Sequence, residues 1–205
     1  FAGFFKKFNV INVFTFGCHY SIESVILYKN IARIDLQYEV DWRQHQMLLK
    51  NLFPLDIHTH EATYEIQFGN IKRPTHRNTS WEQAAFEVWT HKWMDLSEEG
   101  YGVSFLNDCK YGVSVKGTLV GLTLLKSGVF PNETADQEHH SFTFALLPHK
   151  GNWKQAGTVA EAYRLNTELW IARKPNEGGV QPPQFCMAES LNSNIVLETI
   201  KQAED

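Results

Sequence analysis

Apolar and polar residues alternate along much of this chain, which is the pattern expected of half-buried β-strands. The alternation is clearest in residues 21–28 and 32–42. Gly69-Asn70 and Lys116-Gly117 supply residue types that suit tight turns between strands. The same reading predicts further strands over residues 53–58, 62–68, 86–95, 102–107, 113–116, 119–125, 141–148 and 194–201. So many strands predict an all-β fold built as a large antiparallel sandwich.

Helical signal is confined to one segment of about residues 153–165, where Ala, Gln, Glu and Arg favour a short helix. Residues 173–183 contain three prolines and two glycines, which predicts a loop. Residues 1–16 are apolar but are interrupted by lysine and asparagine, which favours a strand over a signal peptide. With no internal repeat, residues 1–205 are expected to form a single domain. The missing initiator methionine predicts that this domain is truncated, and we expect truncation at both ends.

Composition excludes several classes of function. The formal net charge of −4 disfavours nucleic-acid binding, which normally requires a basic face. No apolar run approaches the roughly 20 residues needed to span a bilayer, so no membrane partner is expected. The three cysteines form no disulfide framework and suit a reducing compartment.

Histidine and carboxylate pairs offer little catalytic chemistry. Alternate residues of a strand share a face, so His58 and His60 could begin a metal site, but no third ligand is evident. Asp95 with Glu98, and Asp35 with Asp41, have no spacing that would place two carboxyl groups across a sugar. Solvated strand faces explain these residues as well, so no metal ligand and no catalytic residue are assigned.

The segment 107–112 is the sharpest remaining candidate, because it ends a predicted strand and opens a turn. Its Asn, Asp, Lys and Tyr are residue types that bind sugar hydroxyls, although Asn107 and Asp108 could equally stabilise the turn. Lys110 could lower the pKa of Cys109, or the cysteine could be a small buried filler. Arg73 likewise has two interpretations: it could pair with a carboxylate outside this chain, or it could form an ion pair within the sandwich.

Six tryptophans raise a further alternative, because flat aromatic rings can stack on the faces of pyranose sugars. Trp89 and Trp93 would share one face of the predicted strand 86–95, and Trp81 lies beside a turn. Most tryptophans of globular proteins are well buried, so packing in the core or between domains is the competing interpretation.

Several long motifs, spread over about residues 28–203, resemble one family. They include Asp95-Leu-Ser-Glu-Glu-Gly-Tyr-Gly, Asn107-Asp-Cys-Lys-Tyr-Gly and Phe142-Thr-Phe-Ala-Leu-Leu-Pro-His. With the run from Tyr64 to His91, they are similar to the C-terminal region of glycoside hydrolase family 38 α-mannosidases, in the cytosolic or vacuolar branch. The resemblance implies a galactose-mutarotase-like β-supersandwich and a cytoplasmic location.

The resemblance also implies what this chain lacks. In the family, the zinc ligands and the carboxylate nucleophile lie on an N-terminal α/β barrel, which a helical domain follows. The parent would be a retaining enzyme that hydrolyses terminal α-linked mannose with zinc or another divalent metal. This portion, with no cofactor of its own, would buttress the barrel and line the mouth of the active site, and would be inactive alone.

The partners expected on this basis are the missing barrel and helical domains and mannoside oligosaccharides, while assembly into a homo-oligomer stays open. The loop before residue 141 resembles a family loop that carries an aspartate and a histidine, although Glu138 stands where the family usually has glycine. The rival interpretation is a free-standing carbohydrate-binding sandwich without hydrolytic activity. The residues expected to contact substrate or support the site are Arg73, His76, Asn78, Asn107, Asp108, Lys110, Tyr111, Asp136 and His140.

Overall fold

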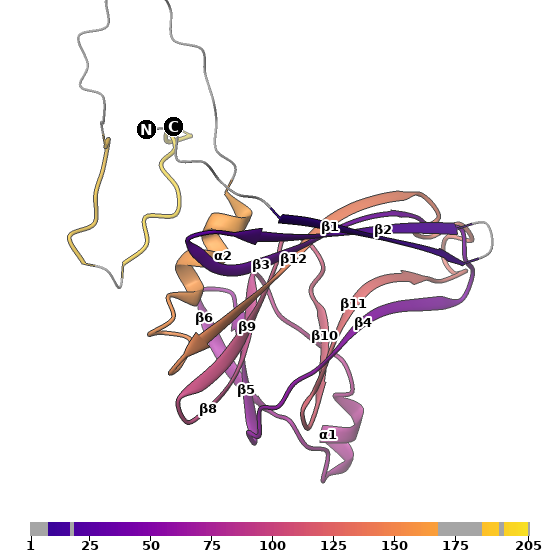
Figure 1. Cartoon of the computed structure of the whole chain (residues 1–205), viewed down its shortest axis with the longest axis horizontal. Helices are drawn as coiled ribbons and strands as arrows, with labels where there is room; N and C mark the ends of the chain where they lie inside the picture. The colour runs from indigo at the N-terminus through magenta and orange to yellow at the C-terminus, as the bar shows by residue number, and fades with distance from the viewer. Residues whose placement is uncertain (1–7, 17–18, 168–185, 193–194, 205) are drawn as a thin grey trace, which may run out of the picture. The chain divides into compact units, whose positions relative to one another are not determined.

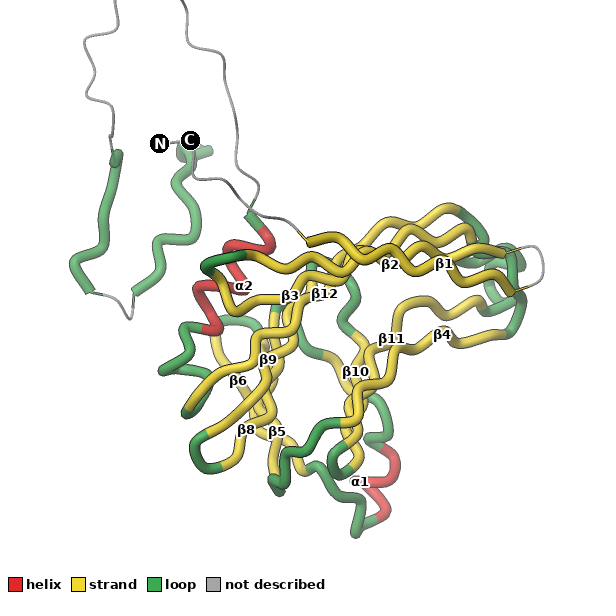
Figure 2. Tube along the Cα trace, viewed as in Figure 1, coloured by secondary structure: helices red, strands yellow, loops and turns green. Residues whose placement is uncertain are grey.

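The structure, a computed structural model, describes residues 8–16, 19–167, 186–192 and 195–204. The chain divides into two units, residues 1–168 and 169–205. The first unit carries all the helices and strands of the described residues, and Figure 2 shows that strands dominate it. Described residues 186–192 and 195–204 of the second unit form neither helix nor strand. The predicted loop at 173–183 lies outside the described residues.

The larger sheet of the first unit has eight antiparallel strands in the order β1-β2-β3-β12-β9-β8-β5-β6 (Figure 1). Neighbouring strands are mostly hairpin partners, but β12 joins two groups of strands that are distant in the sequence. The strands are β1 (Phe8–Phe16), β2 (His19–Tyr28), β3 (Ile31–Asp41), β5 (Glu61–Ile66), β6 (Gly69–Pro74), β8 (Trp93–Glu98), β9 (Tyr101–Asn107) and β12 (His139–Lys150).

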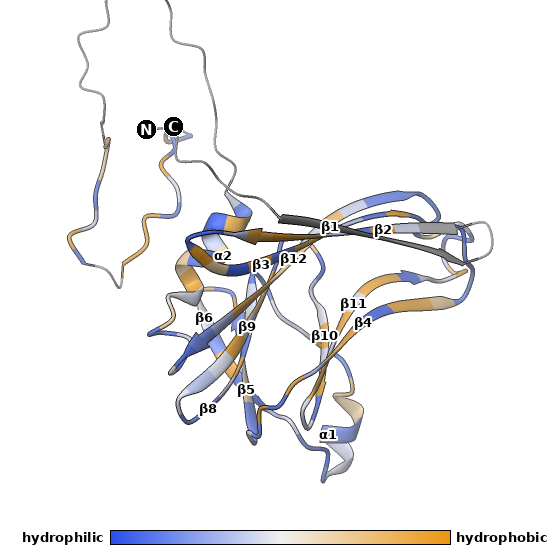
Figure 3. Cartoon of the chain, in the orientation of Figure 1, coloured by the Kyte–Doolittle hydropathy of each residue, from blue (hydrophilic) through white to orange (hydrophobic). Residues whose placement is uncertain are grey.

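The smaller sheet has four antiparallel strands in the order β4-β11-β10-β7. These are β4 (Met47–Pro54), β7 (Val88–Trp89), β10 (Gly112–Lys116) and β11 (Leu119–Ser127). Residues of both sheets form one buried cluster, so the two sheets pack face to face as the alternation predicted. Hydropathy colouring shows apolar stretches on strands of both sheets, β9 and β10 among them (Figure 3).

Two short helices complete the first unit. Helix α1 (Ser80–Ala84) was not predicted, although Thr79 and Glu82 form a capping box that marks its start. Helix α2 (Thr158–Asn166) confirms the predicted helix but begins five residues after residue 153, because Gly157 adopts a left-handed conformation with φ 69° at its N-cap. Its first turns cover Trp93, Leu106 and Ala145 on the outer face of the larger sheet.

Three predicted strands differ from the structure. Strand β4 ends at Pro54, and residues 55–60 form a loop whose buried Ile57 imitates strand alternation. The predicted strand 86–95 is divided into β7 and β8 by a turn, so Trp89 and Trp93 do not share a strand face. Residues 195–201 form no strand and are exposed, because they have no buried face for their apolar side chains to cover.

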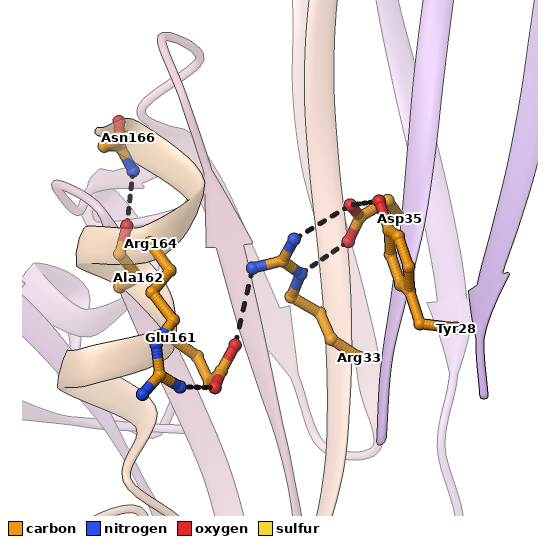
Figure 4. A network of polar contacts seen from close by, with 7 residues as sticks. All are labelled: Tyr28, Arg33, Asp35, Glu161, Ala162, Arg164 and Asn166. Atoms are coloured by element: carbon orange, nitrogen blue, oxygen red, sulfur yellow. Dashed lines mark hydrogen bonds and ion pairs between the residues drawn. The ribbon is translucent and has the colours of Figure 1, made fainter. Parts of the chain in front are cut away.

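A charged network ties α2 to the larger sheet (Figure 4). The Arg33 guanidinium on β3 lies 2.7 Å from Asp35 Oδ1 and 3.4 Å from Glu161 Oε2 on α2. Tyr28 on β2 donates to Asp35 Oδ2 over 2.8 Å, and Arg164 pairs with Glu161 within the helix. The side chains of Arg33 and Asp35 are only 11% and 4% exposed, so this ion pair is shielded from water.

We expect the substitution Arg33→Met to lower the free energy of unfolding by about 3 kcal/mol, because it leaves the buried Asp35 carboxylate without its cation. Urea unfolding of the purified chain measures this. The matched control Arg43→Met removes a pair with Asp41 in which Arg43 is 52% exposed, and should cost less than about 1 kcal/mol. Equal losses in the two variants would contradict the assignment of the Arg33 network as a structural anchor.

Candidate functional site

Arg73, at the end of β6, is held between two aromatic rings. Its guanidinium carbon lies 4.6 Å from the ring centre of Tyr64 and 5.5 Å from that of Trp89. The same group donates a hydrogen bond of 3.1 Å to the backbone oxygen of Trp89. Burial lowers the pKa of Arg73 below its ordinary value and raises that of the Tyr64 hydroxyl to about 12. The contacts are cation–π interactions that fix the guanidinium at the edge of the sandwich.

The row of rings continues from Trp89 to the segment after β9. His91 lies 5.1 Å from the ring of Trp89 and 5.7 Å from that of Tyr111, measured between ring centres. Trp89 and Tyr111 are 43% and 47% exposed, so this end of the row faces water. We call Tyr64, Arg73, Trp89, His91 and Tyr111 the aromatic ladder. It includes two predicted site residues, Arg73 and Tyr111, which lie 38 residues apart in the sequence.

Asn107 holds the backbone of His91, one of the ladder residues. Its amide nitrogen donates to the backbone oxygen of His91 over 2.6 Å, and its backbone oxygen accepts from Asn166 of α2 over 3.0 Å. The residue is 4% exposed, and its side-chain oxygen is buried without a hydrogen-bond partner. Asn107 therefore fixes the turn that carries His91, which is the structural alternative left open by the sequence.

Asp108 is also engaged by the backbone. Its Oδ2 accepts from the Thr143 amide over 2.8 Å, while its Oδ1 is buried without a partner. The adjacent Lys110 lies with its ammonium 5.0 Å from the ring centre of Phe142. These contacts attach the 107–111 segment to β12.

Cys109 in this segment is a free cysteine with some surface open to water. Burial of its thiol and the neighbouring Asp108 carboxylate raise its pKa to about 12, and the Lys110 ammonium only partly opposes them. Lys110 does lower this pKa, as predicted, but burial and Asp108 outweigh its effect. The interpretation of Cys109 as buried filler is wrong, because the residue is exposed. Cys18 lies outside the described residues.

Asn78 and His76 lie beside the start of α1. The backbone amides of Asn78 and Thr79 donate to Glu82 Oε2 over 2.6 and 2.9 Å, and these bonds lower the pKa of Glu82. His76 Nε2 lies 3.9 Å from Glu82 Oε1. Helix α1 lies beside β10 at one end of the smaller sheet (Figure 1). Asn78 thus contributes to the cap through its backbone, and His76 faces the helix start.

A pocket of about 200 Å³ lies beside the ladder and α1. It contains Arg73 and His76, so the structure brings these two predicted residues to one cavity. The complete lining is Tyr64, Arg73, Pro74, His76, Arg77, Trp81, Glu82, Ala85, Val88, Ser114 and Val115.

Asp136 and His140 form a separate feature that shapes the loop before β12. Asp136 has a positive φ of 58°, and its Oδ2 accepts from the Lys126 amide over 3.2 Å. His140 Nε2 lies 2.8 Å from the backbone oxygen of Asp136. These contacts stabilise the loop against β11.

The proposed carboxylate pairs have other partners. Asp95 accepts from Ser104 and lies against His149 at 2.8 Å each, whereas Glu98 accepts from the His58 amide. His58 and His60 lie in a loop, so the expected shared strand face is wrong. Within residues that the structure describes, no three His, Cys, Asp or Glu side chains are placed to hold a metal ion.

Comparison with known proteins decides the family. The family "Glycosyl hydrolases family 38 C-terminal domain" matches residues 9–134. This chain belongs to that family. It is 46% identical to human Alpha-mannosidase 2C1 over 183 residues, which are 89% of this chain and 17% of the human protein.

More distant relatives agree with this assignment. Alpha-mannosidase of Saccharomyces cerevisiae is 40% identical over 85% of this chain, which spans 16% of the yeast protein. A crystal structure of an alpha-mannosidase from Enterococcus faecalis V583 has a TM-score of 0.64 at 16% identity, over 71% of this chain and 17% of the other. The last comparison supports the fold alone. The family 38 chain thus spans about one sixth of the curated relatives it matches.

Sequence reasoning missed the ladder as a unit. Trp89 and His91 lie two residues apart in the sequence, but β7 ends at Trp89 and His91 lies in the turn that follows, so strand alternation does not predict their contact. Their contacts with Arg73 and Tyr111 depend on strand pairing: β7 pairs with β10, with Trp89 opposite Gly112, the residue after Tyr111. No local pattern encodes this pairing.

We expect Cys109 to react slowly with iodoacetamide at about pH 8, at least about tenfold more slowly than the exposed Cys186, because its raised pKa keeps it as the thiol. Asp108→Asn should accelerate the reaction by removing a negative charge that opposes thiolate formation. Mass spectrometry of timed digests measures each cysteine separately. Equal rates at Cys109 and Cys186 would contradict the expected pKa.

Proposed function

We propose that this chain is the C-terminal β-domain of a retaining, cytoplasmic α-mannosidase that hydrolyses terminal α-linked mannose. The observation that carries the proposal is the 46% identity with an α-mannosidase across 89% of the chain, which spans only 17% of that protein. The 183 matching residues are a contiguous portion of a much longer enzyme. The active-site chemistry would then belong to the remainder, as the family resemblance implies.

Zinc, or another divalent metal, is assigned to the remainder for a chemical reason. A catalytic zinc site needs three protein ligands and an open position. Pairs of possible ligands do occur in the described residues, including His149–Asp95 at 2.8 Å and Asp56–His58 at 3.3 Å. Neither pair has a third ligand, so these residues do not fit a catalytic metal.

The exposed apolar side chains indicate where the remainder would dock. Leu48 and Leu52 are 48% and 55% exposed on the edge strand β4, while Trp81 and Phe86 near α1 are 73% and 63% exposed. Edge strands with apolar side chains are usually covered in the complete protein. We propose that the barrel and helical domains cover part of this surface and that the sandwich buttresses them.

The ladder would be the contribution of this domain to the mouth of the active site. Arg73 is rigidly held, partly desolvated and close to a pocket, which are properties of a residue that positions a carboxylate or a sugar hydroxyl. Asn107 and Asp108 would act indirectly, because their side chains bond to backbone groups of this domain. Asn107 would hold the backbone of His91, and Asp108 would hold its own segment against β12.

The second candidate is a carbohydrate-binding sandwich that acts without a hydrolytic partner. The exposed rings of Trp89 and Tyr111 favour it, since both could contact a sugar face. Their planes are tilted relative to the His91 between them, by 43° and 55°, which makes a stepped surface in place of a flat one. Saturable binding of mannose oligosaccharides to this chain, lost in Trp89→Ala, would support the second candidate.

We expect the isolated chain to release no nitrophenol from a nitrophenyl α-mannoside, with or without added zinc or cobalt. The reason is that the described residues offer neither a three-ligand metal site nor two facing carboxylates. A continuous absorbance assay on purified chain measures this. Metal-dependent turnover by the chain alone would overturn the assignment of catalysis to the remainder.

In the full-length enzyme, we expect Arg73→Ala to lower kcat/KM by about 10–100-fold, comparable to the loss of groups that orient the ligands of a metal site. Loss of its ring contacts should cost only about 1–2 kcal/mol of stability. Lys72→Ala is the matched control, because Lys72 lies on the same strand and pairs with the exposed Glu61.

Kinetics and thermal unfolding measured on the same samples separate the two roles. A structural residue would lower the melting temperature and leave the kcat/KM of the folded fraction unchanged. If Arg73→Ala behaves in that way, the ladder is scaffold, and the proposed contribution to the active-site mouth is wrong.

A further inference from the structure

A second, larger hollow lies next to the ladder pocket and is lined by basic side chains. It encloses about 430 Å³ and shares His76 and Arg77 with the smaller pocket. We call it the cationic hollow. Its lining is Ile57, His58, Thr59, His60, Thr75, His76, Arg77, Lys116, Gly117 and Thr118. Every ionisable side chain in this lining is a base.

Backbone hydrogen bonds fix the three segments that form the walls. The Thr75 amide donates to the backbone oxygen of His60 over 3.0 Å, and the Gly117 amide donates to the backbone oxygen of Thr75 over 2.8 Å. The buried Thr75 hydroxyl also donates to the backbone oxygen of Thr59 over 2.6 Å. The hollow therefore lies between the loop before β5, the segment after β6 and the β10–β11 turn. Backbone hydrogen bonds between these segments fix its shape.

The basic groups converge from different segments. His60 and His76 have ring centres 6.3 Å apart at an interplanar angle of 82°. Arg77 donates through one terminal nitrogen to the backbone oxygen of Phe86 over 2.9 Å. A guanidinium carries five N–H donors, so this bond orients the group and leaves further donors for a ligand. Lys116 contributes an ammonium from the β10–β11 turn.

Three carboxylates approach the rim of the hollow. Asp56 lies 3.3 Å from His58 Nε2, Glu98 accepts from the His58 backbone amide, and Glu82 lies 3.9 Å from His76 Nε2. These three carboxylates oppose the two permanent positive charges of Arg77 and Lys116, but none of the three is part of the lining itself.

We propose that the cationic hollow binds a doubly charged oxyanion, a phosphate or sulfate group carried by a small molecule. Arg77 and Lys116 supply positive charge and hydrogen-bond donors. The imidazole rings of His58, His60 and His76 add ring nitrogens that can donate to further oxygens. This site does not depend on the mannosidase activity proposed above.

Titration calorimetry of the 205-residue chain with sodium sulfate, at neutral pH and low ionic strength, tests the proposal. Sulfate is the informative probe because its double negative charge does not change around neutral pH. We expect saturable binding that weakens as sodium chloride is added, because salt screens the charges of the hollow. Acetate, with a single charge, should bind far more weakly.

Two pairs of variants locate the site. Lys116→Gln should weaken sulfate binding by about fivefold, with Lys72→Gln as the control from the neighbouring strand β6. The double variant His60→Gln with His76→Gln should also weaken sulfate binding, because it removes two imidazole rings from the lining. Its control is His139→Gln, because His139 is similarly exposed but pairs with Glu39 on β3.

Mannose 6-phosphate and mannose separate the oxyanion from a sugar as the recognised group. Binding of the phosphate ester and not of mannose supports the proposal. The proposal is overturned if sulfate shows no saturable binding, if acetate binds as tightly as sulfate, or if each variant matches its control. Equal binding of mannose and mannose 6-phosphate would overturn it too, and would leave the proposed α-mannosidase function untouched.

Discussion

The structure of the first unit depends on β12, the strand that joins the two halves of the larger sheet. It pairs with β3 along one edge and with β9 along the other. Alternate residues of β12 serve different layers: Phe142 and Phe144 enter the core between the sheets, and Ala145 packs beneath α2. One strand therefore closes the sheet and contributes to both apolar clusters, and the position of every site segment follows from it.

Polar groups on the outer face of the same sheet complete the attachment of α2. The buried Asp95 carboxylate receives hydrogen bonds from Ser97 and Ser104 and contacts His149 of β12. Ser104 also lies 2.7 Å from the Thr158 hydroxyl in the first turn of α2. A buried charge is tolerated only when several partners satisfy it, so this network specifies how the helix sits on the sheet. The motif residue Asp95 thus has a structural explanation.

The candidate site illustrates how a sandwich end gathers groups that are distant in the sequence. The ladder and the cationic hollow lie on loops and strand ends, where side chains can project without breaking the strand ladders. The pocket beside the ladder and the cationic hollow share His76 and Arg77 in their linings. The chain belongs to the family of glycosyl hydrolases family 38 C-terminal domains and spans about one sixth of the curated α-mannosidases it matches.

The sequence by itself determined the fold class, the family and most strands, because alternation with period two is a local property that burial on one face imposes. It misplaced elements where a local pattern has two causes. Ile57 is buried because the loop that contains it covers the core, and a turn after Trp89 interrupts the aromatic run. Only the tertiary structure decided which residues meet: Arg73 with Trp89, Tyr111 with His91, and His60 with His76. The physical reason is that strand order and register are set by the whole core, and no stretch of sequence contains that information alone.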